Sequence, residues 1–290
     1  MHRVKARGLL SAENTMNLYR GCQHGCIYCD SRSRCYHMDH AFEDIEVKEN
    51  APELLEQALR RKREKCMIGT GAMGDPYIPL ERELGLTRRC LEIVARYGFG
   101  LGILTKSADI LRDLDLLREI HRNAKCVVQM TLTTCDEKLC RILEPGVSTT
   151  GERAEVLFTL RDEGIPTVVW LSPLLPYIND SVENLTGILD YCIRAGVYGV
   201  ICFDMGMTLR EGNREYYYSR LERHFPGLKE RYIQEFGNSY QVSSPNRAQL
   251  WAEFYRLCGE NGIVTDIDRI FTYLRTFENR NYQQMKLDLR

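Results

Sequence analysis

The chain has 290 residues, of which 44% are hydrophobic and 27% are charged, and its formal net charge is −1. These proportions are typical of a globular protein, give no overall attraction for nucleic acid, and include no apolar run of the roughly 20 residues that a membrane helix needs. Twelve cysteines without a secretory leader favour reduced thiols in a cytoplasmic protein.

Short β-rich runs alternate with longer amphipathic segments, which predicts a parallel sheet with helical crossovers. The expected strands are 16–20, 66–71, 100–105, 125–133, 167–172 and 198–203. The expected helices are 52–63, 86–96, 108–122, 151–163 and 182–195. Six such units predict an α/β fold, a TIM-like (β/α)6 barrel, in which the chemistry gathers at the carboxyl ends of the strands.

The alternation of short strands and helices ends after residue 206, where tyrosine-rich and helical segments follow. Residues 215–218 include three consecutive tyrosines, and residues 246–260 have a helical pattern. We therefore expect a barrel over residues 1–210 and a C-terminal helical extension over residues 211–290 that packs on the barrel's open side.

Three cysteines with the spacing C-x3-C-x2-C follow the first expected strand. They are Cys22, Cys26 and Cys29. A four-iron four-sulfur cluster usually takes four thiolates, so three of them leave one iron without a protein ligand, where a small molecule can bind. The spacing also leaves a zinc site open, because His24 lies inside the loop.

The aromatic residue before the third cysteine, Tyr28, completes the signature C-x3-C-x-aromatic-C, in which the chain resembles the radical S-adenosylmethionine enzymes. The resemblance implies that the fourth iron binds S-adenosylmethionine. It also implies that one electron, from a donor such as flavodoxin or ferredoxin, cleaves this cofactor to a 5′-deoxyadenosyl radical that abstracts a hydrogen atom. The barrel is then expected to be the partial, open six-stranded kind.

Further stretches resemble the branch of this superfamily that is related to spore photoproduct lyase. They are NLYRGCQHGCIYCDSRSRCY, MGDPYIPLE, ILTKSADILRDLDLL, TLTT, LEPGVSTTGER and SPLLPYIND, within residues 17–180. The lyases quench the product radical with a cysteine, whereas the aligned residues 72–74 here contain none. We therefore expect a substrate other than a thymine dimer. Two alternatives stay open: a nucleic-acid lesion lyase, or a non-catalytic iron–sulfur or zinc protein that binds nucleic acid through the basic run 60–65.

The candidates for binding the cofactor lie after the strands. The resemblance implies that Tyr28 offers its backbone to the adenine, and that the edge formed by Thr70 and Gly71 accepts hydrogen bonds from the methionyl ammonium. Asp75 continues that loop, or simply forms a turn. Lys106, just past the third strand, is the candidate partner of the methionyl carboxylate.

Residues from the fourth and fifth units complete this candidate set. Thr131 and Thr133 could hydrogen-bond the ribose hydroxyls, although threonine is also a good strand former. Arg153 pairs either with a cofactor carboxylate or with Glu144, and the latter would be a scaffold ion pair. Leu174 could pack on the adenine.

The nine cysteines outside the motif are expected to be mainly inert packing residues. Two of them are candidate hydrogen-atom donors to a substrate radical. Cys35 lies six residues past the motif in a polar loop, and Cys135 directly follows the TLTT segment.

Overall fold

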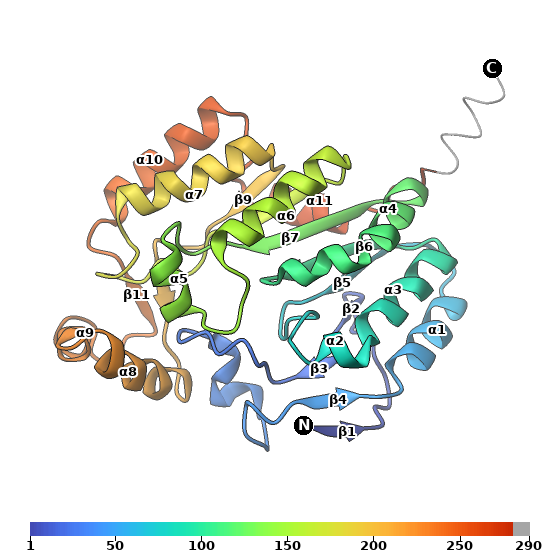
Figure 1. Cartoon of the computed structure of the whole chain (residues 1–290), viewed down its shortest axis with the longest axis horizontal. Coiled ribbons are helices and arrows are strands. Elements are labelled where there is room, and N and C mark those ends of the chain that lie inside the picture. Colours follow the sequence, from blue (N-terminus) through green and yellow to red (C-terminus); the bar gives the residue numbers. More distant parts are fainter. Residues whose placement is uncertain (281–290) are drawn as a thin grey trace.

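The computed structural model describes residues 1–280, and its centre is a six-stranded sheet (Figure 1). The strands are β2 (Thr15–Met16), β5 (Met67–Thr70), β6 (Gly100–Thr105), β7 (Cys126–Thr131), β8 (Thr167–Trp170) and β9 (Gly199–Ile201). They lie in the order β2-β5-β6-β7-β8-β9, and every neighbouring pair is parallel. The predicted α/β class and six-stranded partial barrel are confirmed; β2 and β9 are its terminal strands, and Val264 pairs with the outer edge of β9.

Crossover helices cover one face of this sheet (Figure 1). They are α1 (Ala51–Arg61), α3 (Leu86–Tyr97), α4 (Leu114–Asn123), α6 (Thr150–Asp162) and α7 (Val182–Ala195). A capping box between Thr149 and Glu152 starts α6, and Gly196, in a left-handed conformation, ends α7. Each helix turns an apolar stripe toward the sheet, so the main core lies between these two layers.

Helix α11 (Ile267–Arg275) lies on the opposite face of the sheet (Figure 1). Its residues Ile270 and Leu274 pack with Val127, Val168 and Ile201 of three adjacent strands. The side chains next to these in the strands point the other way, toward the outer helices, as the two-residue period of a strand requires. Both faces of the sheet are therefore covered, as is usual for parallel strands.

The rest of the segment after residue 206 is largely helical, as predicted. Its helices are α8 (Asn213–His224), α9 (Leu228–Phe236) and α10 (Arg247–Glu260), and α10 packs on α7. The antiparallel pair β10 (Gly206–Thr208) and β11 (Gln241–Ser243) was not predicted. In residues 1–280, no helix combines the length and the apolar character that a membrane span requires. The division of the chain at residue 210 stays a prediction.

The expected strand 16–20 was wrong, because two strands of different sheets occupy these residues. β2 belongs to the central sheet, whereas β3 (Tyr19–Arg20) pairs antiparallel with β4 (Glu46–Lys48), which pairs in parallel with β1 (His2–Val4). The backbone carbonyl of Leu18 accepts a hydrogen bond from the Lys48 amide (3.1 Å), so the chain has left the central sheet by this point.

Several other bounds differ from the prediction. The expected helix 108–122 begins with a 3-10 segment, η3 (Ala108–Asp113), before α4. Two 3-10 turns, η1 (Asp30–Arg32) and η2 (Arg34–Tyr36), and two short helices, α2 (Glu81–Leu84) and α5 (Glu137–Leu143), were not predicted. These pieces are shorter than the windows in which periodicity can be read.

The end of β5 offers a test of the barrel geometry. Gly71 has φ +99°, and a Cβ atom there would clash with the carbonyl oxygen of Leu104 in β6. We expect Gly71→Ala to lower the free energy of unfolding by at least about 2 kcal/mol, measured by urea denaturation. Gly102→Ala is the control, because its new methyl group would lie 3.7 Å from Gln129 Nε2. Equal effects of the two substitutions would contradict the close approach of Gly71 to β6.

Candidate functional site

The loop of residues 21–29, here called the cysteine loop, lies at the carboxyl ends of the central strands. Cys22, Cys26 and Cys29 line one cavity of about 80 Å³, together with residues 71–75 after β5 and residues 104–106 at the end of β6. We call this the cluster cavity. The structure thus brings the three predicted ligands together at the edge where a parallel βα fold places its chemistry.

A compact arrangement of the ligand atoms is what a single metal ion requires. Sulfur ligands of a tetrahedral zinc with Zn–S bonds of about 2.3 Å lie roughly 3.8 Å apart. In residues 1–280, one set of three His, Cys, Asp or Glu side chains has its ligand atoms all within 4.8 Å of one another, and it contains no cysteine. The three thiols therefore do not form such a compact set in the described residues, and the preference for a cluster rests on the C-x3-C-x2-C spacing.

Burial disfavours the thiolate form of the cysteines in the metal-free cluster cavity. Burial raises the pKa of the Cys22 thiol to about 12 and the pKa of the Cys26 thiol well above its ordinary value, and the ammonium of Lys106 only partly opposes this. Thiolates bind iron, so loading must release these protons, and the positive charge of the irons favours the charged form. The three residues fit a cluster chemically.

A turn after α5 clamps the cysteine loop from one side. The Ile27 amide donates to the carbonyl of Leu143 (2.9 Å), and the Gly146 amide donates to the carbonyl of His24 (2.8 Å). The His24 ring nitrogen Nδ1 lies 2.9 Å from the Gly146 carbonyl oxygen. A Cβ atom on Gly146 would come within 2.8 Å of the Gln23 and His24 oxygens, so only glycine allows this approach.

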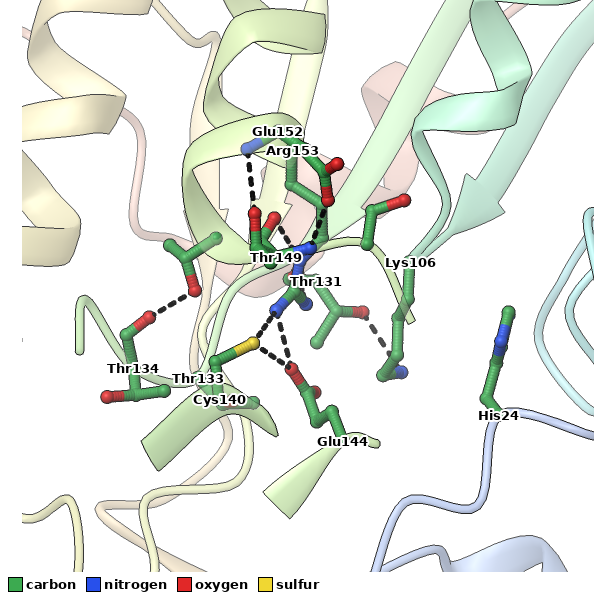
Figure 2. Close-up of polar contacts among 12 residues, drawn as sticks. His24, Lys106, Thr131, Thr133, Thr134, Cys140, Glu144, Thr149, Glu152 and Arg153 are labelled. Carbon is green, nitrogen blue, oxygen red and sulfur yellow. Dashed lines mark hydrogen bonds and ion pairs between the residues drawn. The ribbon is translucent and has the colours of Figure 1, made fainter. Parts of the chain in front are cut away.

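A buried ion pair supports the same clamp (Figure 2). Arg153 Nη2 lies 2.6 Å from Glu144 Oε2, and Nη1 donates to the Thr131 carbonyl (2.7 Å). The Tyr28 hydroxyl donates to the other oxygen of Glu144. Burial opposes ionisation of Glu144, but the charges of Arg153 and Lys106 and the hydrogen bonds from Tyr28 and Arg153 together outweigh it and hold the pKa of this carboxyl below its ordinary value. Of the two partners expected for Arg153, the structure shows Glu144.

Asp75 joins three segments around the cluster cavity. Its Oδ1 accepts hydrogen bonds from the Tyr77 amide (2.8 Å) and the Thr105 hydroxyl (2.7 Å). Its Oδ2 accepts from the Lys106 amide (2.7 Å) and lies 3.1 Å from His24 Nε2. Burial would raise the pKa of Asp75, but His24 and these donors lower it to about 2. Both oxygens are thus occupied by the scaffold.

Lys106 follows the end of β6 and lies beside the cysteine loop. Its side chain borders the cluster cavity and also a larger neighbouring cavity, and its ammonium donates to the Thr131 hydroxyl at 3.3 Å (Figure 2). Burial would lower the pKa of Lys106, but the charges of Cys26 and Glu144 outweigh it and raise this pKa. A lysine cation therefore stands beside the cysteine loop.

The larger neighbouring cavity, here called the mouth cavity, has a volume of about 610 Å³. Tyr28 borders it from the cysteine loop. Sequence reasoning missed most of its other walls, which come from β8, from the segment after β9, and from the β10–β11 pair. They include Trp170, Phe203, Asp204, Thr208, Tyr240 and Gln241. No short motif marks these residues, because the topology brings them together from distant parts of the chain.

Other candidates lie away from the mouth cavity. Thr70 borders an inner cavity of about 320 Å³ between the sheet and α11, which shares Ala72 and Trp170 with the mouth cavity. Thr133 and Leu174 are fully buried in the scaffold. The backbone carbonyl of Thr133 accepts hydrogen bonds from two asparagine side chains.

The two candidate hydrogen-atom donors lie outside the cluster, mouth and inner cavities. Cys35 is exposed, and its sulfur lies 3.3 Å from Arg210 Nη1, whereas its neighbour Tyr36 borders the mouth cavity. Cys135 lies against α7, where a Cβ atom on Gly187 would be 2.6 Å from its sulfur. A donor role for either thiol stays a prediction.

The Glu144 carboxylate can be tested through stability. Glu144→Gln leaves the fully buried guanidinium of Arg153 without its counter-charge, and we expect a loss of about 3–5 kcal/mol in the free energy of unfolding. Tyr28→Phe removes one hydrogen bond to the same carboxylate, so a loss of about 1–3 kcal/mol is expected. Urea denaturation of the metal-free protein measures both. A smaller cost for Glu144→Gln than for Tyr28→Phe would contradict the clamp.

Comparisons with known proteins agree with this geometry. Residues 16–187 match the family model described as the radical SAM superfamily. An uncharacterized protein of Mycobacterium tuberculosis is 31% identical over 275 residues, which are 90% of this chain and 80% of that protein. An uncharacterized protein of Methanocaldococcus jannaschii is 33% identical over 178 residues, 61% of this chain and 65% of that protein. The fold is similar to that of spore photoproduct lyase complexed with dinucleoside spore photoproduct, with a TM-score of 0.64, 14% identity, and coverage of 89% of this chain and 78% of that one.

Proposed function

The chain belongs to the radical S-adenosylmethionine (SAM) superfamily, and from this membership we propose that it cleaves SAM reductively at a four-iron four-sulfur cluster held by Cys22, Cys26 and Cys29. The observation that carries the proposal is the placement of these three thiols around one cavity at the strand ends. When bound, the cluster supplies the electron for cleaving SAM, and the 5′-deoxyadenosyl radical so formed abstracts a hydrogen atom from the substrate. The electron would come from a donor such as flavodoxin or ferredoxin.

In this proposal, Lys106 orients the cofactor by pairing with its methionyl carboxylate. The ammonium borders both the cluster cavity and the mouth cavity, so a carboxylate near the cluster falls within its reach. The hydrogen bond from the Lys106 ammonium to the Thr131 hydroxyl is long at 3.3 Å and therefore weak. Replacing it by a charged hydrogen bond to the methionyl carboxylate would be favourable.

The remaining walls of the mouth cavity would exclude water from the radical and position the substrate. Trp170, Phe203 and Tyr240 give this wall an aromatic character, and its charged residues are Asp30, Lys106 and Asp204. Both carboxylates are paired from outside the cavity, because Arg210 Nη1 lies 3.8 Å from Asp30 and Arg247 Nη2 lies 3.5 Å from Asp204.

The predicted C-terminal extension, residues 211–290, has a part in this proposal. Tyr240 and Gln241 border the mouth cavity, so the segment after the barrel supplies part of the wall that faces the substrate. We propose that substrate selectivity depends on this segment, whereas SAM cleavage depends on the barrel.

The cluster ligands are tested by cysteine substitution. Cys22→Ala, Cys26→Ala and Cys29→Ala should each lose the iron–sulfur absorbance, and 5′-deoxyadenosine formation with dithionite and SAM should fall to background. Cys66→Ala is the matched control, because this half-buried thiol lies outside the cysteine loop. The measurement is chromatography of 5′-deoxyadenosine after anaerobic reconstitution with iron and sulfide. Retained cleavage in the Cys26→Ala protein would overturn the assignment.

The role of Lys106 is tested by its affinity for SAM. Losing a charged hydrogen bond of about 1.5–3 kcal/mol should weaken SAM binding roughly 10- to 100-fold in Lys106→Ala, while the iron content stays that of the wild type. Lys106→Arg keeps the charge and should recover most of the affinity. Equilibrium dialysis of the cluster-loaded protein measures this, and an unchanged affinity in Lys106→Ala would remove Lys106 from the site.

A further inference from the structure

A second group of metal-binding side chains lies on the small sheet formed by β1, β4 and β3. His2, His40 and Asp44 each offer one ligand atom, and these atoms all lie within 4.8 Å of one another. The rings of His2 and His40 meet edge to face with centroids 4.8 Å apart, and His2 Nδ1 lies 3.0 Å from Asp44 Oδ2. None of these residues belongs to the cysteine loop or borders the cluster cavity.

The orientation of His40 is that of a metal ligand. Its Nδ1 lies 3.0 Å from the carbonyl oxygen of Ala41, which can accept only from an N–H, so the neutral ring carries its proton on Nδ1 and its lone pair on Nε2. Histidines that bind metals are usually held in this way by a hydrogen bond from their other ring nitrogen. In residues 1–280, Nε2 of His40 is buried and has no hydrogen-bond partner. A buried nitrogen of this kind is costly unless something binds it.

A fourth group can complete the set. Glu46 lies opposite His2 in the register of β1 and β4, and its Oε2 is 3.9 Å from His40 Nε2. Two neutral imidazoles with two carboxylates carry a charge that balances a divalent cation. Positive charges are also present, because the amino group of Met1 lies 3.0 Å from Asp44 Oδ1 and Lys48 interacts with Glu46. The other carboxylate oxygen of Asp44, Oδ2, lies 3.0 Å from His2 Nδ1 and not near the amino group.

We propose that His2, His40 and Asp44, with Glu46 as the fourth ligand, form a divalent-metal site that takes Zn²⁺. Imidazole and carboxylate ligands in a set of four are typical of tetrahedral zinc. The ion would tie β1 to the loop before β4. The Phe42 carbonyl in that loop accepts the Cys22 amide (3.3 Å), so the ion would hold the cysteine loop indirectly. The evidence for this zinc site does not rest on the proposed SAM cleavage.

The test uses tag-free protein with its iron–sulfur cluster loaded, so that the cluster cysteines are occupied. The protein is incubated with Zn²⁺, freed of excess by gel filtration, and analysed for zinc content and by zinc K-edge absorption, to which iron does not contribute. We expect one zinc per chain with a shell of nitrogen and oxygen atoms and the scattering pattern of imidazole. A sulfur-containing zinc shell, or no retained zinc, would overturn the proposal.

The zinc affinity of variants tests whether His40 and Asp44, in the loop before β4, bind the ion. His40→Ala should weaken zinc binding by at least about 100-fold, since even outer partners of metal ligands are worth 10- to 100-fold. Asp44→Asn has nearly the same shape and should also lose most of the affinity. The matched control is His37→Ala, an exposed histidine in the same segment, which should bind zinc as the wild type does. Undiminished binding in both His40→Ala and Asp44→Asn, or an equal loss in His37→Ala, would contradict the site.

Discussion

The cysteine loop contains no helix or strand between β3 and η1, so its conformation depends on hydrogen bonds and ion pairs with neighbouring segments. The turn at residues 143–146 holds its backbone from one side, and the buried Glu144 carboxylate holds the Tyr28 hydroxyl. Arg153 stabilises this carboxylate in the interior, because it supplies the opposite charge at 2.6 Å. On the other side, Asp75 and His24 join the loop to the ends of β5 and β6. Three thiols can be presented at fixed positions only because both sides are held.

This arrangement separates the residues that build the site from those that would touch the cofactor. Asp75, Glu144 and Arg153 are saturated by protein partners, and they set positions. Lys106 is different, because its side chain borders both the cluster cavity and the mouth cavity, and its hydrogen bond to Thr131 is long at 3.3 Å. The mouth cavity then opens onto aromatic side chains from β8 and from the segment after the barrel. Cofactor binding and substrate choice are thus assigned to different parts of the chain.

The sequence was most informative where function requires a fixed local spacing. The three cysteines lie within eight consecutive residues, and Lys106 directly follows a well-marked strand, so both could be found without a structure. The strand expected at residues 16–20 was wrong because the divergence of β2 and β3 depends on pairing with β4, some 30 residues later. The partner of Arg153 could not be chosen from spacing alone, since Glu144 and a bound carboxylate satisfy the same charge. Trp170 and Tyr240 meet at the mouth cavity only through the topology, and no local pattern marks them.

The central claim is that the cluster on this loop keeps one iron free of protein ligands and binds SAM there. The most direct measurement is pulsed electron–nuclear double resonance on the reduced, cluster-loaded protein with SAM carrying ¹⁵N at its methionyl amino group. We predict a ¹⁵N coupling between the label and the cluster, which disappears when unlabelled SAM is used. Coupling to a protein nitrogen such as that of His24, with none from the label, would show that the protein itself closes the fourth iron and would contradict the claim.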